Sequence, residues 1–226
     1  MDMVVVKVGG SLALFPDKLR SLCAKLAELS RSHKLIVVVP GGGEFADIVR
    51  NLDTRFHLSP KVSHRMAILG MDQYGLLLAD LISNSILVNN LENVQGVLDS
   101  GGLPVFLPAA SLSFEDELEN SWDVTSDSIT LHIAEKLHSP KVILVTDVDG
   151  IYTWDPKKFS DAKLISELSA RRLLEMDKRT SVDKFLPKLL LQLKIDCFVV
   201  NGNFPQRIEA IINEKETVCT LITRNP

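Results

Sequence analysis

The segment Met3-Val4-Val5-Val6-Lys7-Val8-Gly9-Gly10-Ser11 decides the fold, because a run of valines leads directly into two glycines. A continuous apolar run of this length is typical of a strand buried on both faces of a parallel sheet. Apolar residues at helical spacing follow in residues 17–31. A second buried strand at residues 35–39 ends at Pro40-Gly41-Gly42-Gly43, before another expected helix. The repeated order of strand, glycine turn and helix predicts an α/β fold with a mostly parallel sheet and crossover helices.

Residues 60–81 form the most unusual expected helix, because its apolar side chains leave almost no polar face. A helix that is apolar all round is buried on more than one side, which here indicates a central helix or a subunit interface. Further strands are expected at residues 86–88, 105–107, 142–145, 197–200 and 218–222, with a hairpin near 151–154. Further helices are expected at residues 125–137, 186–193 and 206–212, and a loop at the acidic stretch 108–120. We expect one domain over residues 1–226, with a lobe boundary near residue 120.

Composition excludes several classes of protein. The 226 residues carry 25 Lys and Arg against 29 Asp and Glu, and the resulting charge of −4 disfavours a nucleic-acid binder with a broad basic face. The three cysteines are widely spaced without a CxxC pair, so neither a disulfide framework nor a zinc site is indicated. The apolar runs are too short to span a bilayer, and the first ten residues lack signal-peptide features. A soluble cytoplasmic protein without a membrane partner is expected.

The two glycine turns are candidate phosphate cradles. Glycine lets backbone N–H groups approach an anion closely, and ligands of open parallel sheets bind outside the carboxyl ends of the strands. A tight strand-to-helix turn is the alternative for either turn alone. Lys7, two residues before Gly9, is costly to bury among valines without an anion. A GxGxxG fingerprint after the first strand and a GxxxxGK[ST] loop are both missing, which speaks against a dinucleotide site and a P-loop.

Four motifs in this order resemble the amino acid kinase superfamily over nearly the whole chain. They are Lys7-Val8-Gly9-Gly10-Ser11, Gly41-Gly42-Gly43, Asp123-Val124-Thr125-Ser126-Asp127, and residues 146–152 with Asp155-Pro156. The resemblance implies a three-layer α/β/α sandwich and an ATP-dependent phosphotransferase whose acceptor is a carboxylate, carbamate or phosphate. It also implies a homo-oligomer, because related kinases pair through a helix in the region of residues 61–82.

The resemblance implies roles for individual positions. Lys7 would bridge donor and acceptor oxygens, Asp127 would orient the catalytic lysines, and Lys188 would neutralise the β- and γ-phosphates. The implied ATP-binding residues are Gly9, Gly10, Ser11, Thr146, Asp147, Gly150, Tyr152 and Asp155, and the implied acceptor turn is Gly41, Gly42 and Gly43. A helix cap is the alternative for Asp127, and a solvated helix lysine is the alternative for Lys188. Mg²⁺ would be held mainly by nucleotide phosphates and water, without a protein metal cage.

Three stretches resemble a narrower group, the kinases of methanofuran biosynthesis that phosphorylate an aminomethylfuran phosphate to its diphosphate. These stretches are residues 63–75, 121–127 and 182–188. An acceptor with an ammonium and a phosphate group needs an acid, and Glu44, Asp47 and Asp72 are candidates. We expect Asp72 to be the partner because it is a lone acid in an apolar stretch, while His64 is expected at the acceptor phosphate unless it lies at the surface.

Two other functions stay open at this point. A uridylate kinase is one alternative, although the first arginine after the triple glycine is Arg50, roughly two helical turns along. A non-catalytic nucleotide or oxyanion binder is the other, and the complete set of motifs speaks against lost catalysis. A small-molecule phosphate acceptor is therefore the expected partner.

Overall fold

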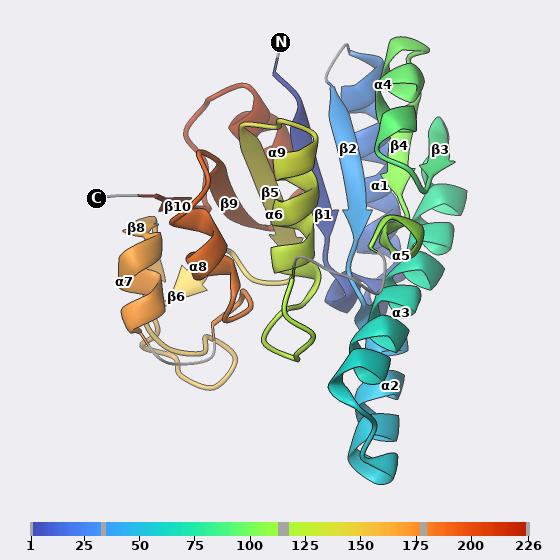
Figure 1. Cartoon of the computed structure of the whole chain (residues 1–226). Coiled ribbons are helices and arrows are strands. Elements are labelled where there is room, and N and C mark those ends of the chain that lie inside the picture. Colours follow the sequence, from blue (N-terminus) through green and yellow to red (C-terminus); the bar gives the residue numbers. More distant parts are fainter. Residues whose placement is uncertain (1, 33–34, 113–117, 177–179, 225–226) are drawn as a thin grey trace.

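The computed structural model describes residues 2–32, 35–112, 118–176 and 180–224, and strands alternate with helices through most of them (Figure 1). Within these residues, eight strands form one sheet. Their order across the sheet is β3 (Ser85–Val88), β4 (Leu103–Phe106), β2 (Ile36–Pro40), β1 (Val4–Val8), β5 (Lys141–Thr146), β9 (Asp196–Asn201), β10 (Thr220–Thr223) and β8 (Glu167–Ser169). Neighbouring strands are parallel except β9 and β10. The prediction of a mostly parallel sheet is confirmed.

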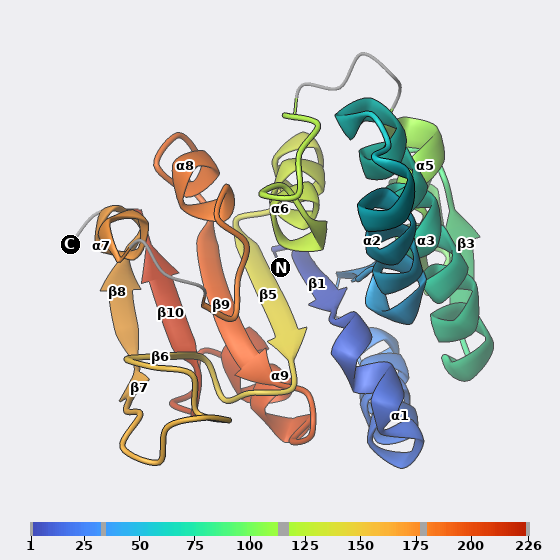
Figure 2. The same ribbon diagram turned by 90° about the horizontal axis from the view of Figure 1, so that it is seen from below.

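Helices cover both faces of this sheet and make three layers (Figure 2). They are α1 (Pro16–Arg31), α2 (Gly43–Phe56), α3 (Pro60–Leu81), α4 (Glu92–Asp99), α5 (Pro108–Ser111), α6 (Ser126–Lys136), α7 (Ala170–Glu175), α8 (Leu186–Leu190), α9 (Gln206–Ile212) and the 3₁₀ helix η1 (Gly10–Leu14). Successive residues of β1 point to opposite faces, so Val5 packs in the core with α6 and α8, while Val4 and Val6 pack with α1 and α9. The predicted α/β/α sandwich is therefore confirmed.

Helix α3 contributes to both cores. Ile68 and Met71 pack in the core that contains α6, whereas Tyr74 and Leu78 pack in the core that contains α1. The expectation that this helix is buried on more than one side is thus confirmed. It is not buried all round, because an exposed apolar stripe runs along it, formed by Val62, Leu69, Leu76 and Leu77.

Some predicted elements differ from the structure. The expected loop at residues 108–120 begins with helix α5, because Pro108 starts a turn that Leu112 N–H closes on the Pro108 carbonyl at 2.9 Å. Residues 113–117 of that stretch lie outside the described residues. Helix α8 ends earlier than expected, and α4 and α7 are short helices that were not predicted. The hairpin expected near residues 151–154 forms as β6 (Ile151–Tyr152) paired antiparallel with β7 (Leu164–Ile165).

Candidate active site

The two predicted glycine turns lie against each other at the carboxyl ends of β1 and β2. A Cβ atom on Gly10 would lie 2.1 Å from Cα of Gly43, so a side chain has no room there. Gly43 has φ +53°, a left-handed conformation that glycine adopts without the steric cost of a side chain. The Gly9 N–H donates to the Val145 carbonyl at 2.8 Å, which fixes the first turn on β5. Bare backbone at the start of α2 is suited to hold a phosphate group.

Lys7 and Asp127 form a buried ion pair beneath these turns. Lys7 lies on the same face of β1 as Val5, and this face is covered by α6, whose first turn carries Asp127. Lys7 Nζ lies 2.7 Å from Asp127 Oδ1, and the two side chains are 10% and 7% exposed. Two charges so far from water are costly unless they are paired. The structure thus brings together the two predicted residues, and their roles in catalysis stay predictions.

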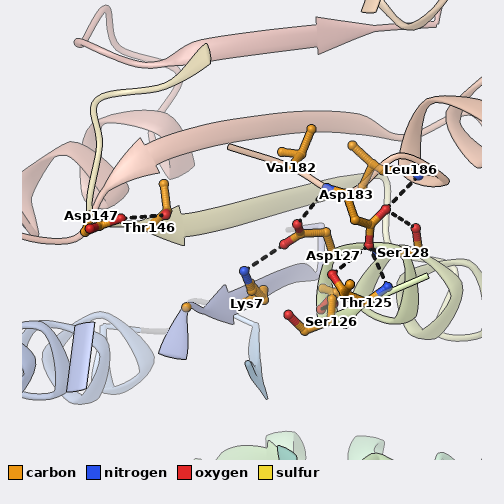
Figure 3. A network of polar contacts seen from close by, with 12 residues as sticks. Lys7, Thr125, Ser126, Asp127, Ser128, Thr146, Asp147, Val182, Asp183 and Leu186 are labelled. Atoms are coloured by element: carbon orange, nitrogen blue, oxygen red, sulfur yellow. Dashed lines mark hydrogen bonds and ion pairs between the residues drawn. The ribbon is translucent and has the colours of Figure 1, made fainter. Parts of the chain in front are cut away.

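A second carboxylate, that of Asp183, lies behind this pair (Figure 3). It accepts hydrogen bonds from the backbone N–H and the hydroxyl of Thr125, both at 2.9 Å, and from the N–H and hydroxyl of Ser128. The carboxylate also accepts from Leu186 N–H at 2.9 Å, while the backbone N–H of Asp183 donates to Asp127 Oδ2 at 3.1 Å. Burial, and then the charge of Asp127, raise the pKa of Asp183. The Asp183 carboxylate therefore caps both α6 and α8, and the Asp183 backbone N–H positions Asp127.

A cavity of about 510 Å³ lies beside Lys7 and the glycine turns. The predicted site residues on its wall are Lys7, Gly9, Gly10, Ser11, Gly42, Gly43, His64 and Thr146. His64 is buried, so the alternative of a surface histidine is wrong.

The rest of the cavity is lined by residues that were not predicted as site residues, except for the ammonium candidates Glu44 and Asp47. Its apolar walls come from Leu14, Ala46, Ala67, Ile68, Met71, Val124 and Ile129. Glu44, Asp47, Arg50, Trp122, Thr125 and Ser126 complete the lining, and Arg50 lies seven residues, about 10 Å, along α2 from Gly43. The cavity therefore has Lys7 and N–H groups at the glycine turns, and the Asp47–Arg50 ion pair and Trp122 farther along α2.

Gly41, Asp72 and Lys188 do not line this cavity. Asp72 Oδ1 accepts the N–H of Ala109 at 3.1 Å and so caps the start of α5, and burial raises its pKa. Lys188 is exposed on α8, where it lines a separate hollow of about 200 Å³ that also contains Asp183. The structure does not place Lys188 beside Lys7 or Asp72 beside the acceptor turn, and their predicted roles gain no support from this geometry.

The end of β5, the loop that follows it and β6 carry the predicted ATP-binding residues of the second half of the chain. Asp147 forms an ion pair with Lys157. Burial alone would raise the pKa of Asp147, but the hydrogen bond and charge of Lys157 outweigh it and lower that pKa. A Cβ atom on Gly150 would lie 2.3 Å from Thr220 Oγ1, so the chain passes too close to β10 for a side chain there. Asp155 Oδ1 accepts the N–H of Lys157 at 3.0 Å and closes the turn at the expected Asp-Pro pair.

Sequence reasoning missed the polar cluster that anchors this loop. Asp149 Oδ1 accepts from Arg207 at 2.6 Å and from Asn201 at 3.0 Å, and the Tyr152 hydroxyl lies 3.4 Å from Asp149 Oδ2. Burial alone would raise the pKa of Asp149, but the hydrogen bonds from Arg207 and Asn201 outweigh it and lower that pKa. These partners come from β9 and α9, more than fifty residues later, so local pattern could not connect them. The role of Asp183 was equally hidden, because its donors Thr125 and Ser128 lie 58 and 55 residues away along the chain.

A metal centre made by the protein itself is not found in the described part of the chain. No three or more His, Cys, Asp or Glu side chains gather there as metal ligands. The same residues contain no helix long and apolar enough to cross a membrane.

The fold and the site together define an α/β protein whose glycine turns, at the carboxyl ends of parallel strands, are suited to hold phosphate groups. The chain belongs to the amino acid kinase family, which matches residues 2–201. It is 36% identical over 220 residues to the [5-(aminomethyl)furan-3-yl]methyl phosphate kinase of Methanocaldococcus jannaschii, covering 97% of both chains. The crystal structure of uridylate kinase from Archaeoglobus fulgidus superposes with a TM-score of 0.76 at 22% identity, over 99% of this chain and 100% of that one. Isopentenyl phosphate kinase of Thermoplasma acidophilum superposes with a TM-score of 0.66 at 25% identity, over 97% of this chain and 99% of that one.

Proposed function

We propose that this protein is an ATP-dependent kinase that converts [5-(aminomethyl)furan-3-yl]methyl phosphate to its diphosphate in the cytoplasm, in methanofuran biosynthesis. One observation carries the proposal: a single cavity combines Lys7 and the glycine turns with carboxylates farther along α2. A phosphate monoester that bears an ammonium group matches these two ends. The relative from Methanocaldococcus jannaschii, which is named for this acceptor, supports the same proposal.

Catalysis would depend on charge placed around the transferring phosphoryl group. An oxygen of the acceptor phosphate attacks the γ-phosphorus of ATP, and the bond to the β-phosphate oxygen breaks to release ADP. Lys7 would bridge the reacting oxygens, with Asp127 fixing its ammonium at 2.7 Å. Backbone N–H groups of Gly9, Gly10 and Ser11 would hold the developing negative charge. Mg²⁺, which needs no protein cage when phosphates and water hold it, would neutralise the nucleotide phosphates.

The two halves of the chain would divide the substrates. Residues 1–120 would hold the acceptor at the turn of Gly41, Gly42 and Gly43, with His64 on the same wall. Residues 121–226 would hold ATP through Thr146, Asp147, Gly150, Tyr152 and Asp155. Lys188 lines another hollow in this structure. It would contact the β- and γ-phosphates of ATP only if α8 moved toward the cavity.

The acceptor ammonium would pair with Asp47 rather than with Asp72. Asp47 lines the cavity, and its 3.5 Å ion pair with Arg50 is open to solvent because its side chain is 66% exposed. Asp72 instead caps α5 by accepting the N–H of Ala109. Asp47→Asn is expected to raise the KM for the aminomethyl acceptor and to leave the KM for a desamino analogue unchanged. Asp72→Asn is the matched control. If it raises the KM for the aminomethyl acceptor more than Asp47→Asn does, Asp72 is the partner of the ammonium group.

A uridylate kinase is the second candidate, favoured by Arg50, which lines the cavity and could meet a nucleotide acceptor. The uridylate kinase of Methanococcoides burtonii is 24% identical over 98% of both chains. Incubation with ATP, Mg²⁺ and each acceptor in turn separates the two candidates by the rate of ADP release. Preferred turnover of the aminomethylfuran phosphate is expected, and preferred turnover of UMP would replace the proposal. No turnover of either acceptor would favour a non-catalytic binder.

We also propose that the protein is a homodimer. Val62, Leu69 and Leu76 of the stripe repeat every seven residues on α3. Helix α3 packs against the edge strand β3, where Ile86 and Leu87 are exposed as well. An apolar surface on a helix and an adjoining sheet edge is suited to pair with a second copy of itself.

A further inference from the structure

We propose that Trp122 is the wall that selects the acceptor, a role that rests on the kinase function proposed above. Its ring closes the far end of the cavity, where a flat acceptor can stack on it and a longer acceptor is stopped. Three features carry this inference: the place of Trp122 between two hollows, the contacts that fix its ring, and the chemistry of the cavity that it closes.

Trp122 and Arg50 separate the cavity from a second hollow. That hollow has a volume of about 530 Å³ and is lined by Arg50, Asp53, Thr54, His57, Leu58 and Trp122. Arg50 and Trp122 line both spaces. They therefore form the partition between the inner cavity, which begins at the glycine turns, and the outer hollow, which lies toward the end of α2. Truncation of the indole would join the two spaces.

The indole ring of Trp122 is held from two sides. Its Nε1–H donates to Asp53 Oδ2 at 2.7 Å, and the Arg50 guanidinium carbon lies 4.8 Å from the ring centroid. Both partners lie on α2, so the segment before α6 is attached to the helix that follows the acceptor turn. A cation over the face and an anchored edge fix the orientation of the ring. A ring that is fixed before binding loses little entropy when a flat acceptor stacks on it.

The walls between the glycine turns and the Trp122 ring suit a small aromatic acceptor. The inner cavity has apolar walls from Ile68, Met71 and Val124 between the glycine turns and Trp122. A small aromatic phosphate ester would place its phosphate at the glycines and its ring against the indole. A nucleoside monophosphate is longer, so its base would extend farther along α2 and meet Trp122 and Arg50. The wall therefore favours the small aromatic acceptor over UMP.

The test compares acceptor selectivity among Trp122 variants of the full-length protein. We expect Trp122→Ala to lower kcat/KM for the aminomethylfuran phosphate about tenfold and to raise kcat/KM for UMP relative to it. Trp122→Phe keeps an aromatic wall and is expected to stay within about threefold of the wild type. Trp154→Ala removes the other, exposed tryptophan and is the matched control, with selectivity unchanged. Equal losses for both acceptors in Trp122→Ala, or no loss for either, would overturn the proposal.

Two further measurements keep the outcome interpretable. If Trp122→Ala fails to fold in a thermal melt, Asp53→Ala is used, since it removes the acceptor that holds the ring and leaves the ring itself in place, and the same change in selectivity is expected at smaller size. In a Trp154→Phe background, Trp122 is the single tryptophan, and its fluorescence should respond to the acceptor in the absence of ATP. Wild-type protein that turns over neither acceptor would refute the kinase function. An unchanged Trp122 emission at saturating acceptor would refute the proposal that the acceptor stacks on this ring.

Discussion

Single residues decide the chemistry, and the buried Lys7 shows how closely function and stability are connected in this chain. Its side chain is 10% exposed, and the charge of its ammonium group is compensated by Asp127 at 2.7 Å. The burial of Lys7 could be predicted from its place among valines, because a strand that is covered on both faces buries every one of its side chains. The identity of its partner needed the family resemblance, since Asp127 is 120 residues away.

Lys7→Ala is expected to lower kcat by at least about a hundredfold, because a donor to the transferring phosphoryl group is lost. The same change should cost about 3–5 kcal/mol of unfolding free energy, since Asp127 is left buried and unpaired. Urea denaturation and ADP release measure the two effects separately. Lys184→Ala is the control, because its pair with Asp123 is exposed and worth under about 1 kcal/mol.

A Lys7→Ala/Asp127→Ala double variant separates the two effects further. Removal of both charges should recover part of the lost unfolding free energy without recovering turnover. Undiminished turnover in Lys7→Ala would refute the role proposed for this lysine.

At the scale of elements, the start of α6 differs from what its sequence suggests. Thr125 stands at the N-cap position, where threonine often caps a helix, yet its side chain makes no cap bond and donates to Asp183 instead. Asp183 takes over the cap, with Ser128 N–H at 3.0 Å. The predicted helix start at residue 125 is correct within one residue, but the capping acceptor comes from another part of the chain.

Asp183→Ala is expected to destabilise the protein by about 2–4 kcal/mol, since N–H groups at the starts of both α6 and α8 lose their acceptor. Asp123→Ala is the neighbouring control and should change unfolding free energy by less than about 0.5 kcal/mol. Urea denaturation at pH 7 measures both variants. An equal, small effect of the two changes would show that Asp183 does not join the helices.

The pH dependence of Asp183→Asn gives a second measure of the same carboxylate. Its pKa is raised by burial and then by Asp127, so the folded chain binds this proton more tightly than the unfolded chain. The stabilisation is present below the ordinary aspartate pKa of about 4 and is lost as the pH rises through the raised value. Asn cannot titrate, so the stability of the variant relative to the wild type should improve between pH 4 and pH 7.

At the scale of the whole molecule, the sheet was predictable and the shape of the site was not. Buried apolar runs and glycine turns are local signals, and they located β1, β2 and their turns correctly. The cavity wall depends on where α2 lies relative to the segment before α6, a relation set by Trp122, Arg50 and Asp53 across about 70 residues. For the same reason Asp72 was expected at the acceptor, although its side chain turns to α5.

The unusual helix at residues 60–81 leads to the last prediction, which concerns assembly. Leu76 is 53% exposed on the apolar stripe of α3, and exposure of several such side chains to water costs free energy that pairing would recover. Light scattering is expected to give twice the chain mass of 25.0 kDa. Leu76→Lys should shift the mass toward one chain, while Val218→Lys, at an exposed apolar residue near β10, should not. A single-chain mass for the wild type at micromolar concentration would mean that α3 and β3 face solvent in the working enzyme.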